Sequence, residues 1–371
     1  MNYRIVYSID QLDQSAWDQI TTDELAMGSA WQRLMEHGWR NQAPCYVLFE
    51  DAAGLAAVMV ASTENTFGRQ GWREHVLRRL TIVVSAPYAS NHCGISMRSD
   101  IRLEQLMPSI QRALAELCWK KRRVLYAISS VWEHDVPLWQ HAGFSISKQP
   151  DYSLLHLPFS SDDAYLKSLA SKDRAEIRRI RRKAVEFGVI CSIGSFEASE
   201  LATIYELICQ VYARYGTTRE TMPFGADMLQ HLHREYGDDF ILFRGYVNGT
   251  LEGVFLTIRS GSSLAWPIAG LNYAVSRSTY LYFILMDEMI RWAIGQGIRV
   301  ISGGLTNERE KRGHGFHVVE RWFCFRAYPN WVNRIFTKGL PLIQRVIGGV
   351  DMPPPKDPVV SHSESAANSL P

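Results

Sequence analysis

The segment GGLTNEREKRGHGF (303–316) carries residues whose types most directly indicate chemistry. It follows a predicted strand (298–302), and sites of α/β proteins often gather where strands end. A lysine there, Lys311, can bind a phosphate or the oxyanion that develops when a carbonyl is attacked. Glu308 and His314 are candidate proton acceptors. The alternative interpretation is an exposed loop lysine beside a structural histidine.

A second chemical feature is the cationic segment 171–183, which contains seven basic and two acidic side chains. Its apolar residues recur at helical spacing. One flank of this predicted helix gathers Arg174, Arg178, Arg181 and Arg182. Like charges one turn apart repel, and a row of phosphates would offset the repulsion. We therefore expect a phosphate track for tRNA or a nucleotide-linked acceptor. The alternative is a solvated helix face balanced by acids elsewhere.

The cysteines and the remaining histidines do not indicate a metal site or a thiol nucleophile. The six cysteines are scattered and form no CxxC pair, which favours a reduced, cytoplasmic setting. His92 and Cys93 are adjacent, so on an extended strand their side chains point to opposite faces. His231 and His233 lie two apart on a predicted helix, which is the wrong spacing for a shared metal ion.

Length and composition indicate a soluble protein of two or three domains. The chain has 371 residues, 46% hydrophobic, and a formal net charge of +2. This balance does not indicate a polyanionic partner for the molecule as a whole. The start, MNYRIVYSIDQLDQ, does not have the pattern of a signal peptide. No run of about 18 apolar residues occurs, so we expect no integral membrane segment.

The elements that must position these residues occur twice along the chain. Strand–turn–strand patterns cover 49–62 and 244–261, the latter with an Asn-Gly turn. Helix–strand patterns cover 113–129 and 289–305, and each is followed by a Gly-Phe pair in HAGF or GHGF. The longer helices are expected over 101–121 and 278–296, and two more over 161–188, ending at Gly188. The shared order favours an internal duplication, although such units are common in any α/β protein.

This order of elements resembles the GNAT acyltransferase fold. PLWQHAGF (137–144) looks like the place where the last helix of that fold closes on a Gly-Phe pair. Two such domains, with SKDRAEIRRIRRKAVEFGV (171–189) opening the second, resemble the Fem-type aminoacyl transferases and their double-GNAT relatives. The Lys311 motif matches the same family. The resemblance covers roughly residues 5–328.

The resemblance implies amide formation by an acyltransferase enzyme, in which an activated acyl or aminoacyl ester meets a small-molecule or peptide amine. Catalysis would rest on positioning and oxyanion stabilisation, with no metal and no tightly bound cofactor. The stretch GLNYAVSRSTYLYF (270–283) lacks the spaced glycines of a phosphate-binding turn. This favours aminoacyl-tRNA over acyl-CoA as the donor. An acyl-CoA-dependent enzyme and an inactive binding protein of the same fold are the alternatives.

The resemblance also suggests which further residues line the substrate cleft. The loop 85–100, the loop 210–225 and the segment 270–283 are expected to border it. The candidate substrate-binding residues are Tyr88, Asn91, His92, Tyr215, Arg219, Asn272, Ser276 and Arg277.

The expected fold class is α/β with mixed sheets, in two tandem GNAT-like domains. We place the first domain at 1–160 and the second at 161–335. A C-terminal helix (336–350) and a disordered tail (351–371) would follow.

Overall fold

The computed structural model describes residues 1–335 except 23, 41–42, 63–79, 85–91 and 306–307. Its strands are β1 (Asn2–Val6), β2 (Pro44–Asp51), β3 (Gly54–Ser62), β4 (Thr81–Val84), β5 (Ile95–Met97), β6 (Leu125–Trp132), β7 (Ser145–His156), β8 (Val189–Ser195), β9 (Phe240–Val247), β10 (Thr250–Ser260), β11 (Ser263–Leu271), β12 (Val300–Gly304) and β13 (His317–Ala327).

Helices cover both faces of the sheet that these strands form. They are α1 (Gln14–Thr21), α2 (Ser29–Gly38), α4 (Leu103–Lys120), α5 (Val136–His141), α6 (Asp162–Ser168), α7 (Ser171–Glu186), α8 (Leu201–Ala213), α9 (Asp227–Tyr236), α10 (Tyr273–Thr279), α11 (Leu281–Gly295) and α12 (Glu308–Arg312). A short 3-10 turn, η2 (Leu25–Met27), precedes α2.

The duplicated element order predicted from the sequence is present in the fold. The hairpin β2–β3 corresponds to β9–β10, whose turn places Asn248 and Gly249 at positive φ, as a type I′ turn requires. The units α4–β6 and α11–β12 correspond in the same way. The expected helix 278–296 is observed as α11 with the separate helix α10 before it. Only Tyr280, in the left-handed conformation, lies between them.

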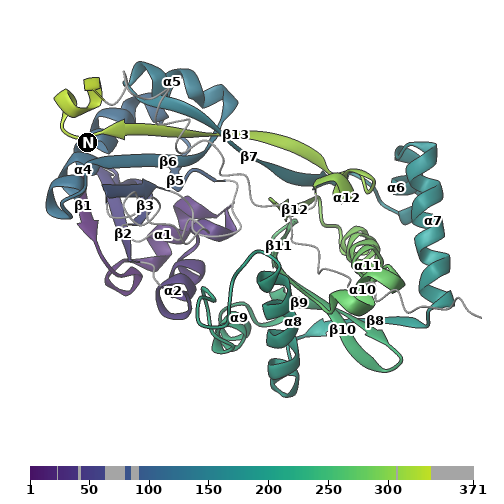
Figure 1. The fold of residues 1–371 in the computed structure, drawn as a ribbon. Helices are drawn as coiled ribbons and strands as arrows, with labels where there is room; N and C mark the ends of the chain where they lie inside the picture. Colours follow the sequence, from purple (N-terminus) through teal and green to yellow (C-terminus); the bar gives the residue numbers. More distant parts are fainter. Residues whose placement is uncertain (23, 41–42, 63–79, 85–91, 306–307, 336–371) are drawn as a thin grey trace, which may run out of the picture.

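The strands of both halves form one continuous sheet because the two halves exchange their last strands. The strand order is β1-β2-β3-β4-β6-β13-β7-β12-β11-β10-β9-β8, with β5 paired to β3. The last strand, β13, therefore lies between β6 and β7, while β7 reaches β12. Figure 1 shows the first lobe on the left and the second on the right, joined by these long strands. The proposed boundary at residue 160 thus separates β13 in sequence from the strands that it pairs with.

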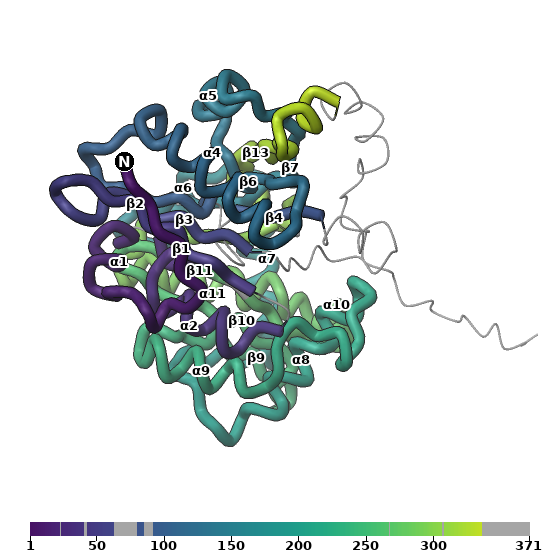
Figure 2. The backbone as a smooth tube through the Cα atoms, turned by 90° about the vertical axis from the view of Figure 1, so that its left-hand side faces the viewer, coloured from purple at the N-terminus to yellow at the C-terminus, as the bar shows by residue number. Residues whose placement is uncertain are grey.

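A hydrophobic core is also shared between the lobes. Trp31 of α2 and Trp39 pack in the same buried cluster as Phe224 and Leu229. The Trp39 and Phe224 rings lie 5.0 Å apart between centroids. Arg33 of α2 pairs with Glu235 of α9 at 2.9 Å. Figure 2, turned by 90°, shows α2 and α9 on adjoining sides of the two lobes.

Candidate functional site

The site begins with a fork between two parallel strands of the second lobe. β11 and β12 pair only over three rungs, ending at Ala265 opposite Ser302. Beyond that rung β11 continues along β10, while β12 follows β7 as far as Gly304. Because β11 stays paired with β10 and β12 stays paired with β7, β11 and β12 separate beyond this rung. Their facing backbone groups are then no longer paired with each other.

Lys311 lies at this fork. α12 places its Nζ where it donates to the carbonyl oxygen of Gly303 on β12 and lies 5.2 Å from the ring centroid of Trp266 on β11. The side chain is only 2% exposed, which excludes the interpretation as an exposed loop lysine. Burial lowers the pKa of Lys311 to about 7. The amine can therefore take up or release a proton near neutral pH.

Aromatic rings surround the fork. Trp266 packs on Phe255 at 4.2 Å and on Tyr282 at 5.8 Å between ring centroids. Phe283 continues the cluster and stacks on the imidazole of His314 at 6.2 Å. These rings exclude water from the lysine amine, and this exclusion is the cause of its lowered pKa.

His314 is buried, at 3% exposure. Its Nδ1 lies 3.4 Å from the carbonyl oxygen of Glu310, and its Nε2 has no hydrogen-bond partner among the described residues. Burial lowers the pKa of His314, so the ring is neutral at physiological pH and retains one acceptor nitrogen. Glu308, in contrast, accepts a hydrogen bond from Arg312 at 2.9 Å on the surface of α12. The geometry thus favours His314 over Glu308 as an auxiliary proton acceptor.

A small pocket of about 140 Å³ lies between the lobes, next to the fork. Ala265 and Ser302, the last paired rung, are part of its lining. Their successors, Trp266 and Gly303, face the opposite side of the sheet because side chains alternate along a strand. Glu24 closes the pocket from the first lobe. The pocket and the buried amine of Lys311 therefore lie on opposite faces of the sheet, and both lie at the fork.

The loop after α8 borders the α12 side of the fork. Arg214 stacks its guanidinium 4.0 Å from the ring centroid of Tyr273. Burial raises the pKa of Tyr215, and the nearby Tyr273 of α10 and Glu310 of α12 raise it further. Arg219, in contrast, is exposed and pairs with Glu206 on α8.

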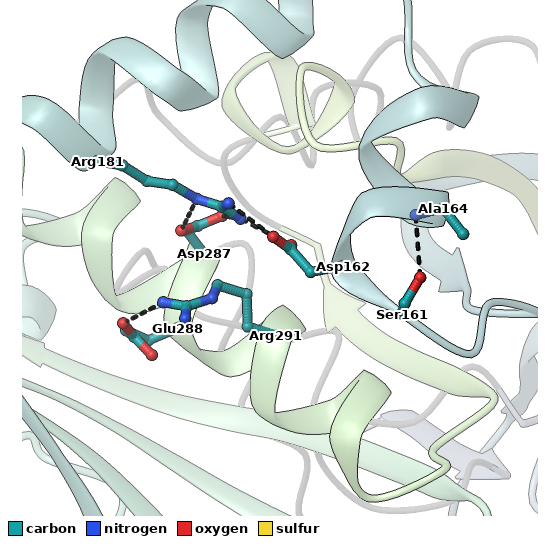
Figure 3. A network of polar contacts seen from close by, with 7 residues as sticks. All are labelled: Ser161, Asp162, Ala164, Arg181, Asp287, Glu288 and Arg291. Carbon is teal, nitrogen blue, oxygen red and sulfur yellow. Dashed lines mark hydrogen bonds and ion pairs between the residues drawn. The ribbon is translucent and has the colours of Figure 1, made fainter.

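Two of the four arginines predicted to form a phosphate track bind other groups of the protein. Arg181 binds Asp162 at 2.7 Å and the buried Asp287 at 2.8 Å, as Figure 3 shows. Arg174 donates to the carbonyl oxygen of Leu169 at 2.6 Å, at the end of α6. Both side chains hold α7 in place.

The other two arginines, Arg178 and Arg182, are exposed on α7, one turn apart. They are the members of the predicted track whose position suits a phosphate ligand.

Asn272, Ser276 and Arg277 belong to α10. Asn272 caps this helix by accepting from the amide of Ala274 at 3.1 Å, and donates to Glu252 at 2.7 Å. The side chain of Ser276 is buried, whereas that of Arg277 is exposed. Because α10 runs almost directly into α11, the first turn of α11 follows another helix instead of a glycine-rich turn.

In the first lobe, Tyr88 and Asn91 lie outside the described residues. His92 is partly buried and accepts from the amide of Gly94 through Nδ1 at 3.2 Å. Burial lowers the pKa of His92 to about 4, so this imidazole is neutral.

Comparison with known proteins identifies the fold. Residues 171–312 match the family described as the acetyltransferase (GNAT) domain. FemX is similar to this chain with a TM-score of 0.59 and 10% identity, over 87% of this chain and 97% of FemX. The chain has a tandem GNAT fold. The match of residues 171–312 confirms the expected GNAT domain, and with it the acyltransferase class, for the second lobe.

Two further structures resemble this chain over most of its length. L-PGS from Bacillus licheniformis has a TM-score of 0.52 and 13% identity, over 86% of this chain and 96% of that one. A tandem GNAT protein from the clavulanic acid biosynthesis pathway has a TM-score of 0.52 and 12% identity, over 88% and 98%. At these identities the likeness concerns the fold. No curated protein has a significantly similar sequence.

Sequence reasoning missed two residues of the site, Trp266 and Glu24. Trp266 lies in an apolar strand, where tryptophan usually indicates core. Glu24 lies in a polar segment of the first lobe, far from the Lys311 motif in sequence. A signal for Trp266 was its place in β11, the strand expected next to the one that precedes Lys311.

In the described part of the chain, no helix has the length and apolar character needed to cross a membrane. The same residues contain no cluster of three potential metal-binding side chains.

Proposed function

We propose that this tandem GNAT protein transfers an activated acyl or aminoacyl group to a primary amine at the fork between β11 and β12. The observation that carries the proposal is the buried amine of Lys311, which lies between Gly303 and Trp266 with its pKa lowered to about 7. Neither an oxyanion alone nor a surface phosphate requires a lysine that is this fully shielded from water.

In the proposed reaction the acceptor amine attacks the donor carbonyl and forms the new C–N bond. The C–O bond of an ester donor, or the C–S bond of a thioester, breaks. Neutral Lys311 takes the proton that the attacking amine loses, and the protonated Lys311 then gives this proton to the leaving oxygen or sulfur. Glu24, in the pocket on the other face of the sheet, would attract the acceptor's ammonium group before it loses its proton.

We favour aminoacyl-tRNA as the donor. Arg178 and Arg182 offer two exposed cations one turn apart on α7, as a phosphate backbone requires. The N-terminus of α11 follows α10 through Tyr280 alone, so this helix start is not built as a pyrophosphate-binding turn. The acetyltransferase description of the matched family supports acyl-CoA as the second candidate donor.

The experiment measures acyl transfer to amine mixtures with charged tRNA or with acyl-CoA, with and without ribonuclease. We expect Lys311→Ala to lower kcat by about 10²–10⁴-fold with either donor, as for the loss of a positioned proton acceptor. Arg309→Ala, which removes an exposed cation from the same helix, serves as the control and should retain activity. Unchanged turnover in Lys311→Ala would contradict the proposed chemistry.

The donor is tested separately. Replacing Arg178 and Arg182 with glutamate should raise KM for charged tRNA and leave the reaction with a small activated ester unchanged. If this variant loses activity only in the reaction with acyl-CoA, the donor is the thioester instead. Turnover of acyl-CoA that ribonuclease does not change would lead to the same assignment.

A further inference from the structure

One end of the first lobe exposes large apolar side chains that a folded chain normally buries. Trp119 is 75% exposed, Trp331 65% and Ile335 64%. Tyr7 and Val124 are exposed to a smaller degree. Trp119 and Trp331 are the two mostly exposed tryptophans of the described chain. We call these five residues the terminal patch.

The strand order brings the terminal patch together at one end of the sheet. α4 ends at Lys120 and leads into β6, so Trp119 and Val124 flank this junction. The amide of Tyr328 donates to the carbonyl oxygen of Val124 at 2.8 Å, so the chain leaves β13 at this end of the sheet. There Asn333 donates to the carbonyl oxygen of Gly143, just before β7, at 3.2 Å. Figure 1 shows this segment after the end of β13. Tyr7, just after β1, joins the same end because Lys121 Nζ lies 4.5 Å from its ring centroid.

The terminal patch is surrounded by positive charge. Lys120, Lys121, Arg122 and Arg334 are all exposed around it. Glu116 pairs with Lys120 at 2.6 Å and so offsets one of these four cations. Exposed tryptophans beside lysine and arginine side chains are the combination that suits the headgroup layer of an anionic bilayer, where rings insert and cations meet phosphates.

We propose that the terminal patch docks the protein on an anionic membrane surface as a peripheral protein. The patch lies in the first lobe, away from the fork, and the proposal does not depend on the acyl-transfer chemistry. Aliphatic side chains such as Ile335 and Val124 favour lipid over RNA, because nucleic acid offers stacking and phosphate contacts but no apolar phase. The surplus of cations opposes the pairing of two copies of the same patch.

The test is co-sedimentation of the full chain with vesicles of pure phosphatidylcholine and with vesicles of equal parts phosphatidylcholine and phosphatidylglycerol. We expect binding to the anionic vesicles alone, weakening as salt rises. Replacing Lys121 and Arg122 together with glutamine should lower the partition coefficient about thirtyfold. Trp119→Ser with Trp331→Ser should lower it by about tenfold.

Matched controls lie elsewhere on the chain. Val185→Ser removes an 83% exposed apolar side chain from α7, and Arg234→Gln removes an exposed cation from α9. Both should bind vesicles like the wild type. All variants change exposed residues, and their thermal unfolding confirms that they are folded.

Three results would overturn the proposal. The first is a wild-type chain that does not bind anionic vesicles. The second is binding that the patch variants leave unchanged or that the controls weaken equally. The third is an association that the patch variants abolish but that occurs with RNA or with a second copy of the chain, and not with vesicles.

Discussion

The chemical character of Lys311 comes from its surroundings. An ordinary lysine is charged up to a pH of about 10.5, whereas burial among aromatic rings brings the pKa of this one to about 7. Its amine donates to a neutral carbonyl oxygen, and a neutral partner compensates a buried charge less well than a carboxylate would. A lysine kept in this state is suited to move protons.

This burial predicts a pH-dependent stability. Between about pH 7 and 10.5 the unfolded chain binds a proton at Lys311 that the native chain does not bind. The free energy of unfolding should therefore rise with pH across this window and reach its full value above it. In Lys311→Met this contribution is absent. Urea titrations of both proteins across the window measure the difference, and parallel pH profiles would show that the native amine titrates normally.

At the scale of elements, one arginine fixes three helices. Arg181 of α7 joins Asp162 at the start of α6 to Asp287 in α11, whose side chain is 4% exposed. Figure 3 shows the guanidinium between the two carboxylates. The cationic helix predicted from the sequence is thus partly an internal clamp. Only its exposed face, with Arg178 and Arg182, is left to meet a ligand.

The clamp predicts a large effect for one arginine and a small one for its neighbour. Arg181→Ala leaves the carboxylate of Asp287 buried without its cation and should cost about 3–5 kcal/mol of unfolding free energy. Arg178→Ala, on the exposed face, should change it by less than about 0.5 kcal/mol. Urea unfolding followed by tryptophan fluorescence compares them. Equal effects of the two substitutions would show that Arg181 does not act as a clamp.

At the scale of the whole molecule, the exchange of β7 and β13 makes the lobes interdependent. β13 pairs with β6 and β7 over most of its length. Without it, the first lobe would expose two long strand edges. The shared core around Trp39 and Phe224 adds to this dependence.

We therefore predict that residues 1–160 alone do not form a stable monomer, whereas the full chain unfolds in one cooperative transition. Sedimentation and denaturant unfolding of both test this. A soluble, monomeric 1–160 fragment with its own cooperative transition would mean that the first lobe does not need β13.

The sequence by itself determined the local elements and the chemical motif. Residue periodicity predicts α4, α7 and both hairpins, because it records which side of each element is buried. The position of Lys311 just after a predicted strand indicated the C-terminal end of β12, which α12 follows. Tertiary structure alone decided that Arg181 is an internal clamp, that Glu24 comes from the other lobe, and that Lys311 is deeply buried. It also decided the exchange of β7 and β13. The clamp and the strand exchange depend on contacts between residues more than 100 positions apart, such as Arg181 with Asp287 and Ser130 with Arg321. The burial of Lys311 depends on Trp266 of another strand. Local patterns carry no record of such partners.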